Sequence, residues 1–203
     1  MNGKLFIISA PSGAGKTSLV KQLVKQLTNL VVSVSHTTRL MRQGEEQGQD
    51  YYFVSVADFQ SMLNHKAFLE YAQVFDNFYG TAQQTVMENL KKGLDVILEI
   101  DWQGAQQVKK ILPECVSIFI LPPSTCVLEE RLRKRGQDDE QVIARRMRDA
   151  VTEISHYSEF DYLIVNDVFD QALIELESIV ISHRLTQSRQ QAYLHTMLLS
   201  LLR

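Results

Sequence analysis

Residues 9–17 of the chain, SAPSGAGKT, have the composition and spacing best suited to chemistry. They follow a short apolar run and precede a stretch of helical periodicity, and glycine-rich backbone in that context can wrap a phosphate chain with its amide N–H groups. The positive end of the following helix adds to the attraction. Lys16 is expected to neutralise the β- and γ-phosphates of a bound nucleotide, and the Thr17 hydroxyl to ligate the accompanying Mg²⁺. The predicted phosphate-binding residues are Ala10, Pro11, Ser12, Gly13, Ala14, Gly15, Lys16 and Thr17.

One position departs from the general pattern GxxxxGK[ST], which has glycine where this chain has Ala10. Alanine is acceptable there only if its φ angle is negative, because the Cβ atom disfavours the left-handed region. The alternative to a nucleotide site is an ordinary glycine-rich turn between a strand and a helix. The register of Gly13, Gly15, Lys16 and Thr17 favours the nucleotide site.

An acidic residue follows a second apolar run, VILEID, which ends at Asp101. In proteins that bind nucleotides through such a glycine-rich loop, an acidic residue at a strand end holds Mg²⁺ beside the phosphates. Asp101 is therefore predicted to hold the metal through water, and Glu99 lies two residues earlier on the same strand face. The alternative role for Asp101 is to cap the helix that follows.

The elements that must position these residues are indicated by apolar runs alternating with helical patterns. The expected strands are residues 4–9, 95–100, 116–121 and 162–165. The expected helices are residues 17–27, 102–111, 125–135 and 169–185. Nearly continuous apolar strands are typical of parallel sheets buried on both faces, so the pattern predicts an α/β fold with crossover helices.

Residues 31–92 have a different pattern. VVSVSH, YYFVSV and FLEYAQVF are alternating or mixed runs separated by polar loops, which predicts a small, partly antiparallel insertion. A helix near 82–92 is expected, because Thr81 and Gln84 have capping-box spacing and Gly93 is suited to end it.

Composition and charge narrow the class of protein. The formal net charge of −3 argues against a dedicated nucleic-acid binder, and no apolar run is long enough to predict a membrane span. Two cysteines without a CxxC or zinc-binding spacing are consistent with a reducing, cytoplasmic compartment.

The tail from residue 187 onward is amphipathic. Its apolar side is expected to pack on the core or, alternatively, to form a homo-oligomer contact.

Taken together, SAPSGAGKT, SVSHTTRLMRQGE, DYYFVSVADF, FLEYAQVFDNFYGT, EIDWQGAQQV, RLRKRGQ and YLIVND resemble guanylate kinases of the bacterial type, over essentially the whole chain. The resemblance implies Mg²⁺-dependent transfer of the γ-phosphoryl group of ATP to GMP, within purine nucleotide metabolism. It implies a three-layer P-loop kinase fold with a parallel core sheet, a small α/β GMP-binding insertion and a helical lid. The implied core comprises residues 1–32, 93–124 and 151–203, the insertion residues 33–92 and the lid residues 125–150.

The resemblance also assigns the GMP site. Glu70 matches the carboxylate that accepts the neighbouring N1–H and N2 donors of guanine, and Ser35 and Thr81 complete the readout of the base edge. Buried polar groups left unpaired cost about 1–3 kcal/mol each, which would exclude adenine. The residues expected to bind GMP are Ser35, Arg39, Arg42, Tyr51, Glu70, Tyr79, Thr81 and Asp101, of which the two arginines and two tyrosines match the phosphate clamp. A solvated loop charge pair and amphipathic packing are the alternatives for the clamp residues.

The lid arginines Arg131, Arg135 and Arg146 match the positions that close on the transferring phosphates, so with Lys16 they are the expected catalytic residues. Asn166 resembles the residue that touches adenine, although an Asx turn closing a strand explains it nearly as well. Glu99 departs from the family, which commonly has aspartate there.

Two alternatives to a GMP kinase differ in what they bind. A guanylate-kinase-like binding module keeps the fold and binds phosphorylated peptides, but such modules typically lose the residues matched by Lys16 and the lid arginines. A kinase acting on a phosphorylated sugar would have no use for Glu70, Ser35 and Thr81, because its acceptor has no base edge. ADP release on addition of GMP distinguishes both from the expected kinase.

Overall fold

The computed structural model describes residues 2–74, 76–134 and 140–203. Its centre is a five-stranded, fully parallel sheet in the order β2-β7-β1-β8-β9. The strands are β1 (Leu5–Ser9), β2 (Leu30–Val32), β7 (Asp95–Glu99), β8 (Val116–Leu121) and β9 (Tyr162–Val165). The four core strands expected from the sequence are all present, and β2 adds a fifth at one edge.

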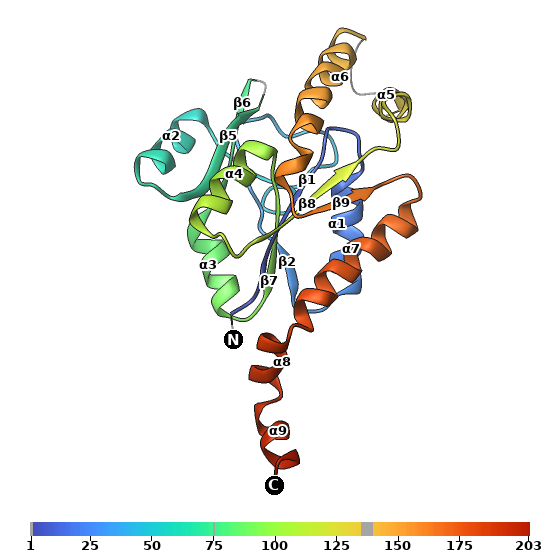
Figure 1. Cartoon of the computed structure of the whole chain (residues 1–203). Helices are drawn as coiled ribbons and strands as arrows, with labels where there is room; N and C mark the ends of the chain where they lie inside the picture. Colours follow the sequence, from blue (N-terminus) through green and yellow to red (C-terminus); the bar gives the residue numbers. More distant parts are fainter. Residues whose placement is uncertain (1, 75, 135–139) are drawn as a thin grey trace.

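Helices cover both faces of this sheet, which makes three layers (Figure 1). Alternate residues of β1 face opposite sides, so that Phe6 and Ile8 pack towards α1 and α7 while Leu5 and Ile7 pack towards α3 and α4. The covering helices are α1 (Lys16–Gln26), α3 (Gln83–Lys91), α4 (Trp102–Ile111) and α7 (Phe169–Arg184). This arrangement confirms the α/β class and explains why the strands are apolar on both faces.

The insertion forms its own four-stranded sheet in the order β4-β3-β6-β5, mixed in direction. Its strands are β3 (His36–Thr37), β4 (Tyr52–Phe53), β5 (Phe68–Val74) and β6 (Asn77–Ala82). The run VVSVSH is divided between the two sheets, because β2 joins the core. The helix α2 (Val56–Asn64) was not expected, although Ser55, whose hydroxyl accepts from the Asp58 N–H, is the kind of cap that marks a helix start.

The helix at 83–91 is present, but the expected capping box is wrong. Ala82 is the N-cap, and it makes no side-chain capping bond. The Thr81 hydroxyl donates to Glu70 instead, and the Gln84 amide donates to Glu88. Thr81 is directly opposite Glu70 in the β5–β6 pair, so a partner on another strand takes its hydroxyl.

Two helices stand at the opposite side of the core from the insertion sheet, above the ends of β8 and β9 (Figure 1). They are α5 (Thr125–Lys134) and α6 (Glu140–Ser155), and a short 3₁₀ turn, η1 (Tyr157–Glu159), leads from α6 to β9. Leu128 and Leu132 of α5 are fully buried, so the helix is fixed by packing rather than by its charged face.

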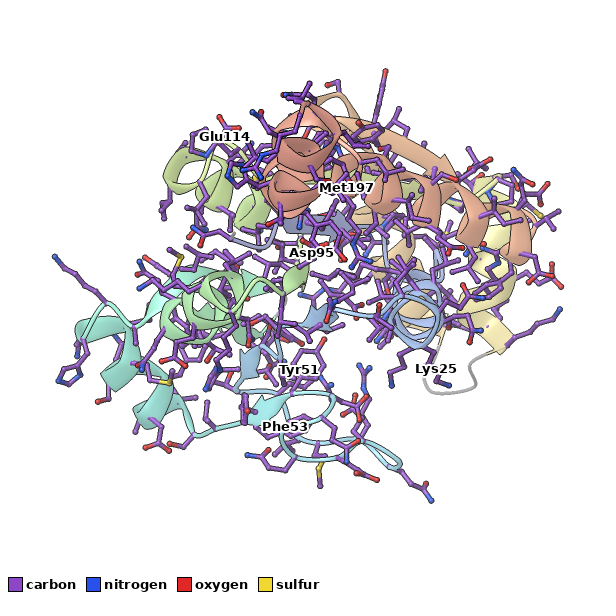
Figure 2. All side chains as sticks on the ribbon, turned by 90° about the horizontal axis from the view of Figure 1, so that it is seen from below. Lys25, Tyr51, Phe53, Asp95, Glu114 and Met197 are labelled. Atoms are coloured by element: carbon purple, nitrogen blue, oxygen red, sulfur yellow. The ribbon has the colours of Figure 1, made fainter. Side chains whose placement is uncertain are left out.

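The C-terminal tail extends away from the core as α8 (Gln187–Tyr193) and α9 (His195–Leu201) (Figure 1). Neither helix has a buried residue, so the expectation that the tail packs on the core is wrong. Tyr193 is 79% exposed and Leu201 71% exposed. The tail is held at its start, where Arg184 and Arg189 both pair with the buried Asp95, at 2.8 and 3.0 Å. Figure 2 views the molecule from below, with the tail towards the viewer, and labels Asp95 and Met197.

Among the described residues, no helix has the length and apolar character that crossing a membrane requires.

Candidate active site

The carboxyl ends of the core strands, the insertion sheet and α6 together surround a cavity of about 710 Å³. The phosphate-loop residues 10–13 and 15–17 form one wall, and Glu70 with Tyr51 and Tyr79 forms another. Arg146 and Glu153 reach the cavity from α6. Ligands of open parallel sheets bind at this end of the strands, so the cavity lies where the chemistry is expected.

The loop between β1 and α1 has the backbone conformation that its glycines permit. Gly13 and Gly15 have φ angles of 94° and 92°, which a side chain would strain. Outside glycine, Asn29 and Lys66 alone have positive φ among the described residues. Ala10 therefore has the negative φ that its departure from the general pattern requires. Helix α1 begins at Lys16, so its positive end faces the loop.

Asn166 braces this loop from the end of β9. Its side-chain amide donates to the Ala14 carbonyl oxygen at 2.7 Å, and a Cβ on Gly15 would lie 2.3 Å from the same nitrogen. The Asn166 carbonyl oxygen in turn accepts from Arg131 at 2.9 Å. Asn166 thus connects the loop to α5, whereas its contact with adenine stays a prediction.

The two acidic residues near the metal position differ in what they touch. The Asp101 carboxylate accepts from the Gly104 N–H at 2.8 Å and caps α4, the alternative role that the sequence left open. The Glu99 carboxylate accepts from the Thr17 hydroxyl at 2.9 Å. Glu99, rather than Asp101, is therefore the carboxylate that reaches the hydroxyl expected to ligate Mg²⁺. A metal role for Asp101 through water stays a prediction.

Glu70, Thr81 and Ser35 form one chain of hydrogen bonds across the insertion. The Thr81 hydroxyl donates to Glu70 at 2.5 Å, and the Thr81 and Ser35 hydroxyls are 3.2 Å apart. Glu70 is 3% exposed, and burial raises the pKa of its carboxyl group to about 7. A Cβ on Gly104 would lie 2.5 Å from the other Glu70 oxygen, so the glycine leaves room for the carboxylate.

Arg39, Tyr51 and Tyr79 come together, as the predicted phosphate clamp requires. The Arg39 guanidinium lies 5.4 Å from the centre of the Tyr51 ring, and the Tyr51 and Tyr79 rings are 5.9 Å apart. Glu45 accepts from Arg39 at 2.7 Å and from the Arg42 backbone N–H at 2.8 Å. Figure 2 shows Tyr51 beside Phe53, the second ring that Arg39 covers. The Arg42 side chain is exposed and lines the cavity.

The lid arginines are placed differently from one another. Arg146 lines the cavity, whereas Arg131 is held by Asn166 and has a buried Nη1 atom with no hydrogen-bond partner. Arg135 lies outside the described residues. Arg145, next to Arg146, approaches Asp76 of the insertion at 3.8 Å, so α6 and the insertion meet across the cavity.

Sequence reasoning did not select Glu153, Gly104 or Glu45. Gly104 and Glu45 lie within the quoted motifs EIDWQGAQQV and SVSHTTRLMRQGE, but no residue-type pattern gave them a role.

Near the same site, the Trp102 and His156 rings stack with their centres 3.6 Å apart, which joins the start of α4 to the residue that follows α6. Within the described residues, no group of three His, Cys, Asp or Glu side chains could hold a metal ion without other ligands.

Comparisons with known proteins give the family that this chain resembles. The family model described as guanylate kinase matches residues 2–183. The chain is 60% identical to the guanylate kinase of Methylococcus capsulatus, and 98% of each chain is covered. It is 59% identical to that of Saccharophagus degradans, again over 98% of each. The crystal structure of guanylate kinase from Anaplasma phagocytophilum matches with a TM-score of 0.78 at 33% identity, covering 93% of this chain and 89% of that one.

Proposed function

The chain belongs to the guanylate kinase family and is an ATP:GMP phosphotransferase, and on this premise we propose how its residues share the work. The observation that carries the assignment is that one cavity has the phosphate loop on one wall and the buried Glu70 on another. A polyphosphate and a purine can then meet inside a single cavity, as group transfer requires.

Magnesium fits the residues beside the loop. The Thr17 hydroxyl and the Glu99 carboxylate are 2.9 Å apart, and both are the hard oxygen donors that this ion prefers. Together with phosphate oxygens of ATP they would complete its ligand set, with Asp101 as a further ligand through water. When bound, the ion neutralises charge on the phosphates. Thr17, in the first turn of α1, and Glu99, at the end of β7, orient the phosphate chain of ATP.

The acceptor needs no general base, because the phosphate of GMP is already anionic. The chain supplies alignment and positive charge instead. Lys16 offsets charge on the β- and γ-phosphates, and Arg146 stabilises the migrating phosphoryl group from α6. Arg131 and Arg135 complete the proposed set of catalytic residues. Arg39, Arg42, Tyr51 and Tyr79 hold the phosphate of GMP without offering a base.

Guanine selection follows from one carboxylate. An ionised Glu70 accepts both N1–H and the N2 amino group of guanine, whereas adenine presents an acceptor at N1. Thr81 and Ser35 keep the Glu70 side chain in one orientation, since they form a continuous hydrogen-bond chain with it. The wrong base leaves this buried group unpaired, at a cost of about 1–3 kcal/mol.

Closure of the lid and the insertion over the substrates excludes water, which competes as an acceptor. The Arg145 guanidinium lies 3.8 Å from the Asp76 carboxylate, so α6 and the insertion are able to reach each other across the cavity. Energy transfer between dyes on α2 and α6 should rise when both nucleotides bind. An unchanged signal with both nucleotides present would contradict closure.

The decisive assay compares acceptors. ADP release is measured with ATP and GMP, dGMP, AMP or a ribose phosphate, at matched concentrations. GMP should be used well, and AMP and the ribose phosphate poorly. Equal rates with GMP and AMP would refute the role given to Glu70.

The exposed tail supports a proposal about assembly, and the two cysteines support one about the compartment. Met197 and Leu201, which are 47% and 71% exposed, offer an apolar surface for a second copy of the chain. Sedimentation of the chain ending at residue 186 should give a smaller mass than the full chain if the tail joins the copies. A cytoplasmic site of action is consistent with the free cysteines Cys115 and Cys126.

A further inference from the structure

Glu153 is a carboxylate of the cavity that the proposed mechanism does not use. It lies in the last turn of α6, two turns after Arg146, so the two side chains share one face of the helix. Both line the cavity together with residues of the phosphate loop. A negative side chain is therefore placed where the most negative part of the substrate must bind.

Glu153 lies near enough to the phosphate loop to be affected by its charge. The Lys16 ammonium and the Ser12 backbone N–H both favour the charged form of the carboxylate. These groups belong to the loop proposed to hold the phosphates of ATP. The same electrostatic attraction would draw a phosphate oxygen to the loop.

The remainder of the environment disfavours the charge of Glu153. Burial raises the pKa of its carboxyl group to about 7, and Asp101 and Asp149 add repulsion, against the opposing effects of Lys16 and the Ser12 N–H. Its Oε2 atom is buried and has no hydrogen-bond partner. A structural carboxylate would normally be satisfied on both oxygens, so its position is explained poorly by a role in holding the fold.

We infer that Glu153 competes with the nucleotide polyphosphate for the positive charge of Lys16, and so lowers the affinity of the phosphate loop for ATP until it is displaced. The inference rests on the proposed function, because it assumes that the loop binds phosphates. Displacement of Glu153 would also free the face of α6 that carries Arg146. Arrival of ATP and movement of the lid helix would then be one event.

The test is Glu153→Gln, which keeps the size and shape of the side chain but removes its charge. Titration calorimetry measures binding of ATP, of inorganic tripolyphosphate and of GMP, each in the presence of Mg²⁺. We expect the dissociation constants for ATP and tripolyphosphate to fall by a similar factor, roughly tenfold. The constant for GMP should stay within about twofold of the wild type, because the insertion is not altered.

A matched control is Glu114→Gln, which removes the same charge from an exposed loop. Glu114 lies at the periphery, well away from Tyr51 in Figure 2, and its variant should bind ATP like the wild type. Without nucleotide, Glu153→Gln should melt no lower than the wild type, since it removes an unfavourable charge. A lower melting temperature, or ATP binding that is unchanged or weaker, would overturn the inference.

The outcomes also separate the inference from its premise. If the wild type binds neither ATP nor tripolyphosphate, the proposed function of the loop fails. If it binds both and Glu153→Gln binds them no better, the loop assignment stands and the competition does not. An improvement with ATP but none with tripolyphosphate would also refute the competition, because the carboxylate is argued to act on phosphates.

Discussion

Replacing Gly104 with alanine should damage GMP recognition from a residue that need not touch the substrate. The new Cβ would lie 2.5 Å from a Glu70 oxygen, whereas ordinary contact begins at 3.4 Å, so the carboxylate must move by about 1 Å. Thr81 holds the other Glu70 oxygen at 2.5 Å, which resists that movement. A shift of this size misaligns the two hydrogen bonds to guanine. The cost should be about 2 kcal/mol, or roughly thirtyfold in kcat/KM for GMP.

The assay follows ADP release as GMP is varied at saturating ATP, and calorimetry then measures ATP binding alone. ATP binding should be unchanged, because the phosphate loop lies on another wall of the cavity. Alanine also has a higher helix propensity than glycine by about 1 kcal/mol, which limits any loss of stability in α4. Lys110→Ala, on the exposed side of the same helix, serves as the control. A kcat/KM for GMP within twofold of the wild type would refute the reasoning.

Three further predictions concern individual side chains of the site. The KM for GMP should rise as the pH falls below about 7, because the pKa of Glu70 is raised to about 7 and its protonated form accepts one guanine N–H fewer. A KM that stays constant from pH 8 to pH 6 in the ADP-release assay would contradict this. Lys16→Ala should lower kcat by roughly a hundredfold or more while the circular dichroism spectrum is kept, and near-normal turnover would remove its assigned role. Glu99→Gln should raise the Mg²⁺ concentration needed for half-maximal rate, roughly tenfold, and an unchanged Mg²⁺ dependence would show that Glu99 is not at the metal.

The core of the fold could be predicted because its signals are local. Strands such as Val116–Leu121 are buried on both faces, so nearly every residue in them is apolar, and the run itself marks the element. The phosphate loop could also be predicted from neighbouring residues, because Gly13 and Gly15 adopt positive φ angles and the helix begins at Lys16. In both cases the constraint acts on neighbouring residues.

Hydrogen bonds between residues far apart in the sequence could not be predicted from spacing, although the resemblance already placed Thr81 and Glu70 in one GMP site. Thr81 has the spacing of a helix cap, but the strand pairing puts it opposite Glu70, and the buried carboxylate takes its hydroxyl. Glu99 and Thr17 are far apart in the sequence and meet only because β7 lies beside β1. Glu153 reaches the loop through the placement of α6. No pattern in the sequence states these pairings.

In the amphipathic tail the local pattern could be predicted from the sequence, but the surface that covers it could not. A stripe of apolar residues indicates that one face of a helix avoids water, but it does not say what covers that face. Arg184 and Arg189 pair with Asp95 at the bottom of the sheet, and from there α8 and α9 lead away from the core. The expected packing of the tail on the core is wrong, and the alternative, a contact with a second copy of the chain, stays a proposal.

The stacked rings of Trp102 and His156 make Trp102 an intrinsic fluorescence probe of α6. Trp102 is the only indole in the sequence, and the imidazole it touches directly follows α6. Any swing of that helix alters the overlap of the two rings, and with it the emission of the indole. Stopped-flow fluorescence of the unlabelled protein can therefore time the lid in milliseconds, against the chemical step measured in the same mixing experiment.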